Sequence, residues 1–221
     1  MAGLPRRRGV SMYAIDHVVL AVADLGEAGE RLHREHGLAS VPGGVHPRWG
    51  TGNRIVPLGG DYVELIAVVD PEVGRSTALG RAVLALTDDG RDRWFAVCLS
   101  DSDIDATAER LGLTVEPGER SRPDGEHIRW RGAGIEDDHR AAWLPFFIAW
   151  EVPSALHPGR TAIDHDADVL GIARVEVAGD AGRLRAWLGP SGDGLPIEVV
   201  DGEPGVRAVE LATAGGDAIR L

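Results

Sequence analysis

Three stretches of the chain share one pattern of apolar and polar positions. Each has an apolar run of strand length, then an acidic residue, then a short amphipathic segment that ends near a glycine. The copies begin at Ile15, Trp94 and Ile172, so the pattern recurs at intervals of about 80 residues. Each copy predicts a strand followed by a helix. Recurrence at a fixed interval predicts that one structural unit is repeated along the chain.

The first copy predicts a β-α-β-β-β unit. Residues 15–23 form its first strand, and its helix begins after Asp24, which is suited to an N-cap, and ends at Gly37. The three strands that follow are predicted over 38–41, 53–58 and 62–69. The Gly-Gly-Asp turn at 59–61 joins the last two of them as a hairpin.

The second copy repeats this order of elements. Its strands are predicted over 94–99, 113–117, 127–131 and 146–152, and its helix over 101–111. A helix over 76–86 connects the first two units, and the polar loop 132–143 is long enough to cover a cleft. The third copy is shorter, with a helix over 182–188 and strands over 172–177, 197–200, 206–212 and 218–221.

Both faces of the first strand are largely apolar. Val18, Leu20 and Val22 lie on one face, whereas Val19 and Ala21 lie on the other. One face can pack on the helix of its own unit, and the other requires a second unit or a ligand to cover it. We therefore predict an α+β fold in which repeated βαβββ modules pair into a curved mixed sheet around a cup.

This pattern predicts three parts of the chain. Residues 1–11 are predicted to be a disordered tail, and 12–159 a single domain of two βαβββ modules. A linker over 153–168 leads to a third, shorter βαβββ-like module over 170–221. A homodimer formed through this third module is one hypothesis for its role.

Composition narrows the classes of partner. The net charge of −12 disfavours nucleic acid and anionic membranes, and no apolar stretch is long enough to span a bilayer. Asp16 and His17 interrupt the apolar segment that follows the basic N-terminus, which argues against an export signal. The single cysteine, Cys98, forms no disulfide within the chain. We expect a soluble cytoplasmic protein with a small-molecule ligand and neither a nucleic-acid nor a membrane partner.

The chain contains no lysine, so all its basic side chains apart from histidine are arginines. Schiff-base chemistry, pyridoxal phosphate catalysis and a P-loop lysine are therefore excluded. Arginine remains protonated, so it can bind anions but is a poor proton shuttle.

Paired βαβββ units resemble the vicinal oxygen chelate superfamily, which includes glyoxalase I. The opening strand IDHVVLAVADL is similar to that superfamily's first strand, which commonly supplies a histidine ligand. GGVHPRWGTGNRIVPLGGDYVELIAV and LPFFIAWEVPSALHPG resemble the glyoxalase-like domain subgroup. The resemblance covers about Tyr13 to Gly159 and implies a vicinal oxygen chelate fold.

The resemblance implies only part of a metal site. His17 matches the first-strand histidine, and Glu64 matches the carboxylate of the fourth strand. In the second unit Ala96 replaces the histidine, while Glu151 stands near the fourth-strand position.

The third unit departs from the pattern in a similar way. Glu210 matches Glu64 there, but Arg174 replaces the histidine.

Residue chemistry leaves two interpretations of this pair open. An unpartnered carboxylate inside the apolar run 62–69 would be costly, and a divalent Zn, Ni, Mn or Fe ion would satisfy both His17 and Glu64. Such an ion needs a third ligand, for which His46 or His127 is a candidate. Alternatively, Glu64 pairs with an arginine and His17 is a hydrogen-bonded core histidine.

Further candidates would bind the ligand itself. Trp49 and Asn53 lie near His46 in a Gly/Pro-rich segment, a composition typical of loops over a ligand. His127, Arg129 and Arg131 alternate along one strand face and either clamp an anion or face water. Trp150 is a candidate for the wall of the cup.

Two functional hypotheses follow. The first is a metal-dependent lyase or isomerase of the glyoxalase type, in which the metal binds a small oxygenated metabolite and Glu64 or Glu151 moves a proton. The second is a metal-free protein of the same fold that binds or sequesters a small molecule.

Overall fold

The computed structural model describes residues 13–122, 125–137 and 141–221. The tail predicted over 1–11 lies outside the described residues. The first module comprises β1 (Tyr13–Ala21), α1 (Leu25–His36), β2 (Val41–His46), β3 (Thr51–Pro57) and β4 (Tyr62–Val68). Two helices, α2 (Pro71–Ser76) and α3 (Ala78–Leu86), connect it to the second module.

The second module comprises β5 (Arg93–Asp101), α4 (Ile104–Leu111), β6 (Val115–Ser121), β7 (His127–Ala133) and β8 (Phe146–Trp150). Two short 3₁₀ helices, Ser154–Leu156 and Pro158–Arg160, follow. The last part comprises β9 (Val169–Ala178), α5 (Ala181–Leu188), a 3₁₀ turn (Gly189–Gly192), β10 (Ile197–Val200), β11 (Gly205–Thr213) and β12 (Ala218–Arg220).

The helices of the two modules begin and end on the same local chemistry. The Asp24 side chain accepts a hydrogen bond from the backbone of Glu27, and Asp103 caps α4 in the same way. Both helices end at a glycine in the left-handed region, Gly37 and Gly112.

Two elements differ in the structure from their predicted positions. The second strand lies over Val41–His46 rather than 38–41, so His46 is a strand residue. The connecting helix predicted over 76–86 is preceded by α2, and the two helices meet at Thr77 in an extended conformation. Asp70 and Pro71, which favour a helix start, mark the beginning of α2.

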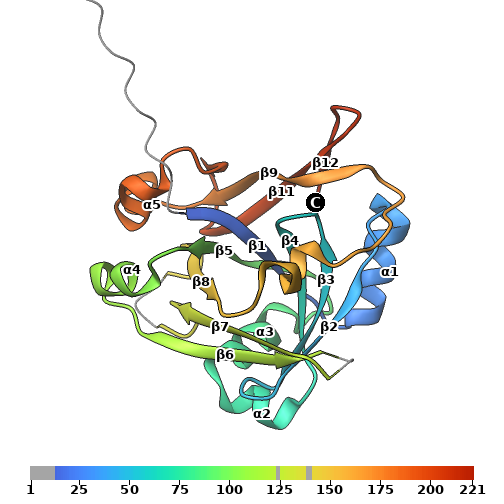
Figure 1. Ribbon diagram of the computed structural model, residues 1–221, viewed down its shortest axis with the longest axis horizontal. Coiled ribbons are helices and arrows are strands. Elements are labelled where there is room, and N and C mark those ends of the chain that lie inside the picture. The colour runs from blue at the N-terminus through green and yellow to red at the C-terminus, as the bar shows by residue number, and fades with distance from the viewer. Residues whose placement is uncertain (1–12, 123–124, 138–140) are drawn as a thin grey trace, which may run out of the picture.

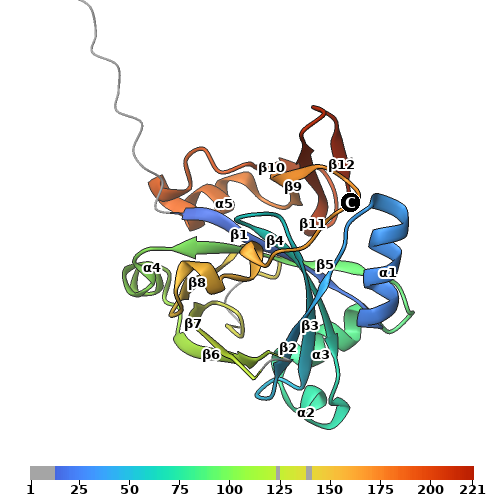
Figure 2. The ribbon, with the colours of Figure 1, turned by 45° about the vertical axis from the view of Figure 1, so that its right-hand side comes forward.

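The first and second modules close into an eight-stranded barrel in the order β1-β4-β3-β2-β6-β7-β8-β5 (Figures 1 and 2). Their first strands, β1 and β5, pair antiparallel, and β2 meets β6 at Val45 and Ser121. The predicted α+β fold class with paired βαβββ modules is therefore confirmed. The sheet curves far enough to close, so each of the eight described strands has a neighbour on both sides.

The third unit keeps the order of elements but not their pairing. Its sheet has the order β10-β9-β11-β12, so its first strand lies between its second and third strands. In the first module the first strand pairs with the fourth instead. The third unit therefore has the predicted βαβββ order of elements with a different strand pairing, because the alternation of apolar residues specifies strands without specifying their neighbours.

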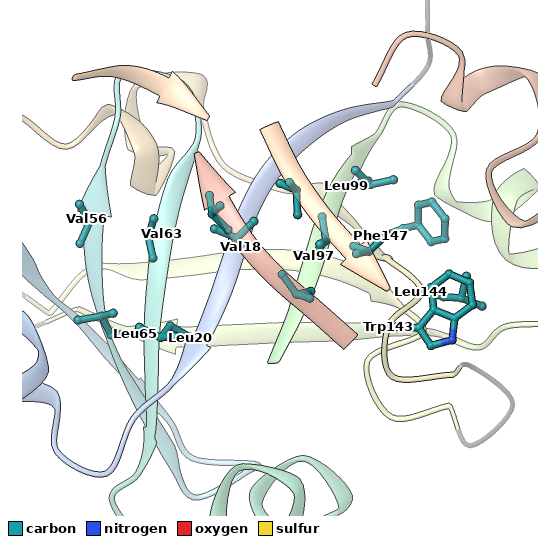
Figure 3. Close-up of a cluster of buried hydrophobic side chains, with 14 of the residues drawn as sticks. Val18, Leu20, Val56, Val63, Leu65, Val97, Leu99, Trp143, Leu144 and Phe147 are labelled. Carbon is teal, nitrogen blue, oxygen red and sulfur yellow. The ribbon is translucent and has the colours of Figure 1, made fainter. Parts of the chain in front are cut away.

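Alternate residues of β1 belong to two different cores. Val18 and Leu20 belong to one cluster with Val97 and Leu99 of β5, on the outer face of the barrel (Figure 3). The third sheet covers this outer face, with β11 against β5 (Figure 1). The inward residues Val19 and Ala21 belong to a second cluster inside the barrel, which α3 joins through Leu79 and Val83.

Among the described residues, no helix has the length and apolar character needed to cross a bilayer.

Candidate functional site

A small cavity lies inside the barrel, with a volume of ≈ 50 Å³. Both modules and α3 line it, mainly with apolar and aromatic side chains. The polar side chains of the lining belong to His17, His46, Asn53, Tyr62, Glu64 and Arg120. An apolar enclosure with a few convergent polar groups is typical of a small-molecule site.

His17 and Glu64 meet in this cavity from adjacent parallel strands. The register of β1 and β4 places Glu64 beside Val19, two residues along from His17. Nε2 of His17 lies 3.4 Å from Oε2 of Glu64, and both side chains are nearly inaccessible to solvent. The other oxygen, Oε1, accepts a hydrogen bond of 2.6 Å from the Asn53 side chain.

Asp16 determines which nitrogen of His17 faces Glu64. Its Oδ1 lies 2.7 Å from Nδ1 of His17, and a carboxylate can only accept. The proton of neutral His17 is therefore on Nδ1, and the Nε2 lone pair points toward Glu64. His17 also stacks on Tyr62, with ring centroids 4.5 Å apart.

His46 occupies the same cavity as a neutral group at pH 7. Its Nδ1 lies 3.0 Å from the Thr51 hydroxyl, and its ring meets Trp49 and Trp130 edge-on. Burial lowers the pKa of His46 to about 4, and the charge of Arg120 adds to this effect against the opposing charge of Glu64.

The His17–Glu64 pair fits two ligands of a divalent cation. Ligand atoms at about 2.1 Å from a tetrahedral ion are about 3.4 Å apart, which matches the separation of Nε2 and Oε2. A carboxylate on the second nitrogen, as Asp16 provides, is the usual outer partner of a metal-bound histidine. These donor types suit Zn, Ni, Mn or Fe.

The third predicted ligand does not complete a tight group. Among the described His, Cys, Asp and Glu residues, the one trio with ligand atoms all within 4.8 Å of one another is Asp16, His17 and Cys98. His46 therefore shares the cavity with His17 and Glu64 without forming such a trio with them.

The second module has no equivalent of the pair. Val18 of β1 lies opposite Val97 of β5, so Ala96 occupies the position that corresponds to His17. By the same correspondence Cys98 of β5 is the counterpart of Val19 of β1. Val19 pairs with Glu64 and Cys98 pairs with Phe146, so Phe146 occupies the position that corresponds to Glu64. Glu151 follows the end of β8 and is exposed in an outer groove beside Arg129, outside the cavity. Its predicted match to the fourth-strand carboxylate is corrected by this register.

The remaining candidates divide between the cavity and the outside of the barrel. Trp49, Asn53 and Trp150 line the cavity. His127, Arg129 and Arg131 lie on the outer face of β7, because the alternating Ile128 and Trp130 take the inward positions. Arg131 pairs there with Asp105 of α4.

Sequence reasoning missed Asp16 and Arg120. Alternation along β1 assigns Asp16 to the face opposite His17, and only an irregular register brings the two together. Arg120 lies in the polar stretch 119–122, which has the composition of a loop. No signal in the sequence separates its buried guanidinium from the exposed arginines nearby.

In the third unit, the residues aligned with His17 and Glu64 form an ion pair. Arg174 lies 2.7 Å from Glu210 and also contacts Glu198. Glu210 stands on β11 directly opposite Arg174, so it is a third-strand residue rather than the fourth-strand equivalent of Glu64. This corrects its predicted match.

Comparison with known proteins identifies similar sequences and folds. The sequence profile of the glyoxalase-like domain family matches residues 15–190. A search of curated proteins found no match.

Several solved structures are similar to this chain. A hypothetical protein from Staphylococcus aureus has 19% identity over 94% of this chain and 85% of its own, with a TM-score of 0.63. A Streptomyces coelicolor methylmalonyl-CoA epimerase in complex with 2-nitronate-propionyl-CoA has 22% identity over 65% of this chain and 100% of its own, at a TM-score of 0.43. The Mycobacterium tuberculosis methylmalonyl-CoA epimerase has 22% identity over 63% of this chain and 90% of its own, with a TM-score of 0.44. The Staphylococcus aureus structure shows that the fold extends over nearly the whole chain.

Proposed function

This chain belongs to the glyoxalase-like domain family of the vicinal oxygen chelate superfamily, and we propose that it is a metal-dependent lyase or isomerase. Its substrate is a small oxygenated metabolite. The observation that carries this proposal is the convergence of Nε2 of His17 and Oε2 of Glu64 at 3.4 Å inside the barrel. Two acceptors that face each other in an apolar cavity need a cation or a proton between them.

His17 and Glu64 are the residues that would hold the metal. When bound, a divalent cation supplies a Lewis acid that stabilises negative charge on a substrate oxygen. Asp16 keeps the lone pair of His17 directed into the site, and Asn53 holds Oε1 of Glu64 in place. The side chains of His17 and Glu64 are therefore oriented before a metal or substrate binds.

Glu64 would also move the proton. Among the described residues that line the cavity, it is the one carboxylate. Its burial removes competing water, so it can take a proton from a carbon next to the substrate oxygens and return it. The aromatic walls formed by Trp49, Trp130 and Trp150 exclude solvent from this exchange.

The size and lining of the cavity favour a compact oxygenated substrate with few charged groups. A volume of ≈ 50 Å³ holds about four water-sized groups, which suits the oxygenated end of a small molecule. Arg120 is the one arginine among the described lining residues. A polyphosphate would need several such donors, whereas a single carboxylate or enolate oxygen would not.

The direct test is metal binding by the full chain. We expect the purified protein to carry or accept one Zn, Ni, Mn or Fe ion per chain, measured by elemental analysis and calorimetry. His17→Ala and Glu64→Gln should each weaken that binding at least about tenfold, because each removes one of two ligands. Glu151→Gln is the matched carboxylate control and should bind metal as the wild type does.

Catalysis can be followed before the substrate is identified. Small hydroxycarbonyl compounds incubated with the loaded protein in D₂O should exchange a carbon-bound proton, detected by NMR, and Glu64→Gln should abolish the exchange. A wild-type protein that neither carries metal nor binds added metal would refute the proposed function.

A metal-free binding protein is the second candidate, and the asymmetry of the barrel favours it. Ala96 and Phe146 replace the second pair of ligands, and Arg120 brings a positive charge into the cavity. In this case a protonated His17 would neutralise Glu64, and the ligand would be a small anion or apolar molecule. Tryptophan fluorescence of the metal-free protein would then respond to such ligands and remain unchanged by chelators.

A further inference from the structure

The bond between Asp16 and His17 depends on a bulge in β1. Successive residues of a regular strand point to opposite faces, so their side chains do not meet. Here the pairing with β5 shifts between Ile15 and His17: Ile15 lies opposite Leu99 and His17 opposite Cys98. Asp16 is the extra residue, and its carboxylate turns into the interior beside His17, where it is 3% exposed.

The last residue of β8 and the segment after the barrel each supply one donor to the other oxygen of Asp16. Nε1 of Trp150 lies 2.8 Å from Oδ2, and Nε2 of His157 lies 3.1 Å from it. Burial alone would raise the pKa of Asp16, but the hydrogen bonds from His157 and His17 outweigh it and hold the pKa well below its usual range. Asp16 is therefore an ionised acceptor with both oxygens engaged.

The backbone fixes the orientation of His157. Its Nδ1 accepts a hydrogen bond of 3.1 Å from the backbone N–H of Gly159, so in the neutral ring the proton is on Nε2, facing Asp16. Gly159 is held in turn, because its carbonyl accepts from the Gly59 backbone in the β3–β4 turn. A Cβ on Gly159 would lie 2.5 Å from the Asp61 carbonyl oxygen, so the segment packs closely on that turn.

These contacts form one continuous chain of hydrogen bonds. It leads from the backbone of Gly159 through His157 and Asp16 to Nδ1 of His17. Asp16 accepts at both ends of its carboxylate, from Nε2–H of His157 at Oδ2 and from Nδ1–H of His17 at Oδ1, so His157 fixes the position of the carboxylate that His17 donates to. The free nitrogen of His17 is thereby directed at Glu64.

We propose that His157 is a positioning residue of this site: it holds the Asp16 carboxylate, which fixes the nitrogen that His17 presents to Glu64. The segment that leads to the third sheet therefore completes the site from outside the barrel. This proposal rests on the proposed role of His17 and Glu64 and adds the residue that keeps them aligned.

Two substitutions separate positioning from a merely structural role. In His157→Asn the side-chain oxygen can still accept from Gly159, but the amide cannot reach Asp16. In His157→Gln the amide nitrogen extends as far as Nε2 and can still donate to Asp16. His33→Ala, at an exposed histidine of α1, is the control for loss of a histidine.

The first measurement is NMR of the metal-free protein with ¹⁵N-labelled histidine. We expect a slowly exchanging Nδ1–H signal of His17 in the wild type, in His157→Gln and in His33→Ala, and its loss in His157→Asn. The second is Zn²⁺ affinity, which should fall about tenfold in His157→Asn and be restored in His157→Gln, as for other outer-shell partners of metal ligands.

Similar behaviour of the Asn and Gln variants in the NMR measurement would overturn the proposal, whether both resemble the wild type or both lose the signal. The two proposals fail separately. A wild type without Zn²⁺ binding refutes the metal-dependent function, while the NMR signal of His17 still decides the role of His157.

Discussion

Single residues inside the barrel differ in how their charges are balanced. Asp16 has three hydrogen-bond donors, and one oxygen of Glu64 accepts from Asn53. His46 has a neutral partner, the hydroxyl of Thr51, and lies in the same cavity as Arg120. Asp16 is thus stabilised as an anion, whereas His46 is stabilised without its proton.

His46 should make the stability of the protein depend on mildly acidic pH. Its pKa is about 4 in the folded protein against an ordinary value of 6.5 in the unfolded chain, so the unfolded chain binds the proton first as pH falls. Neutral His46 therefore costs the folded protein no stability above pH 6.5, and stability is lost as the pH falls from 6.5 to 4. The free energy of unfolding should fall by up to about 1.4 kcal/mol per pH unit in that range.

Urea unfolding at several pH values checks this expectation. His46→Gln retains a partner for Thr51 but has no titrating group, so its stability should change less between pH 6.5 and 4. The lowered pKa of Asp16 also reduces stability at the acidic end of this range, but both proteins contain Asp16, so its effect is the same in each. Equal pH dependence in the wild type and in His46→Gln would contradict the assignment.

How far single residues could be predicted depends on what positions them. His17 and Glu64 are predicted from the resemblance of their strands to the vicinal oxygen chelate superfamily, and their strands β1 and β4 pair in the structure. The inward turn of Asp16 follows from a bulge, and a bulge is set by the partner strand rather than by β1 itself. The buried position of Arg120 likewise depends on β2 and β6 meeting at the closure of the barrel.

At the scale of elements, close approach between strands shapes the cavity wall. Gly118 of β6 lies directly opposite Trp130 of β7, and the indole lies over the glycine. Trp130 in turn meets His46 and Trp150 edge-on. The absence of a side chain at Gly118 thus determines where one wall of the cavity stands.

Gly118→Ala should displace that wall. The new Cβ would lie 2.3 Å from the Trp130 ring, so the indole or the strand must move. Overpacking of this kind costs about 1–3 kcal/mol, and the near-ultraviolet circular dichroism of the tryptophans should change with it. Gly60→Ala is the control, because a Cβ there meets nothing within 4 Å and should leave stability within about 0.5 kcal/mol. Equal unfolding midpoints for both variants would show that the wall tolerates the methyl group.

Elements were predictable where periodicity was strong and less so where glycine interrupts it. The run Pro42-Gly43-Gly44 has the composition of a turn, yet it lies within β2. Gly44 accommodates this with a φ of 149°, and the pairing of β2 with β3 shifts between Pro42 and Gly44. The strand exists because β3 and β6 provide partners on both sides, which a local pattern does not reveal.

At the scale of the molecule, the third sheet and the barrel share one core. The outer face of β1 and β5 needs a cover, as the apolar alternation of β1 predicts, and the third sheet supplies it. Val175, Val209 and Leu211 are fully buried in that contact region. An apolar face used within the chain is not available to a second copy, so a homodimer would need another surface of the third unit.

A shared core predicts that the whole chain unfolds in one transition. Leu211 of β11 is fully buried, and its truncation to alanine should cost about 2–5 kcal/mol. Because β11 packs on β5, that loss should lower the melting temperature of the barrel as well as that of the third sheet. Differential scanning calorimetry should show a single peak for the wild type and for Leu211→Ala, with the calorimetric and van't Hoff enthalpies equal. Leu170→Ala, at a side chain that is 64% exposed, should leave the peak in place. Two peaks, with only one of them shifted in Leu211→Ala, would mean that the third sheet folds independently. The third sheet would then contribute little to holding β1 and its site residues in position.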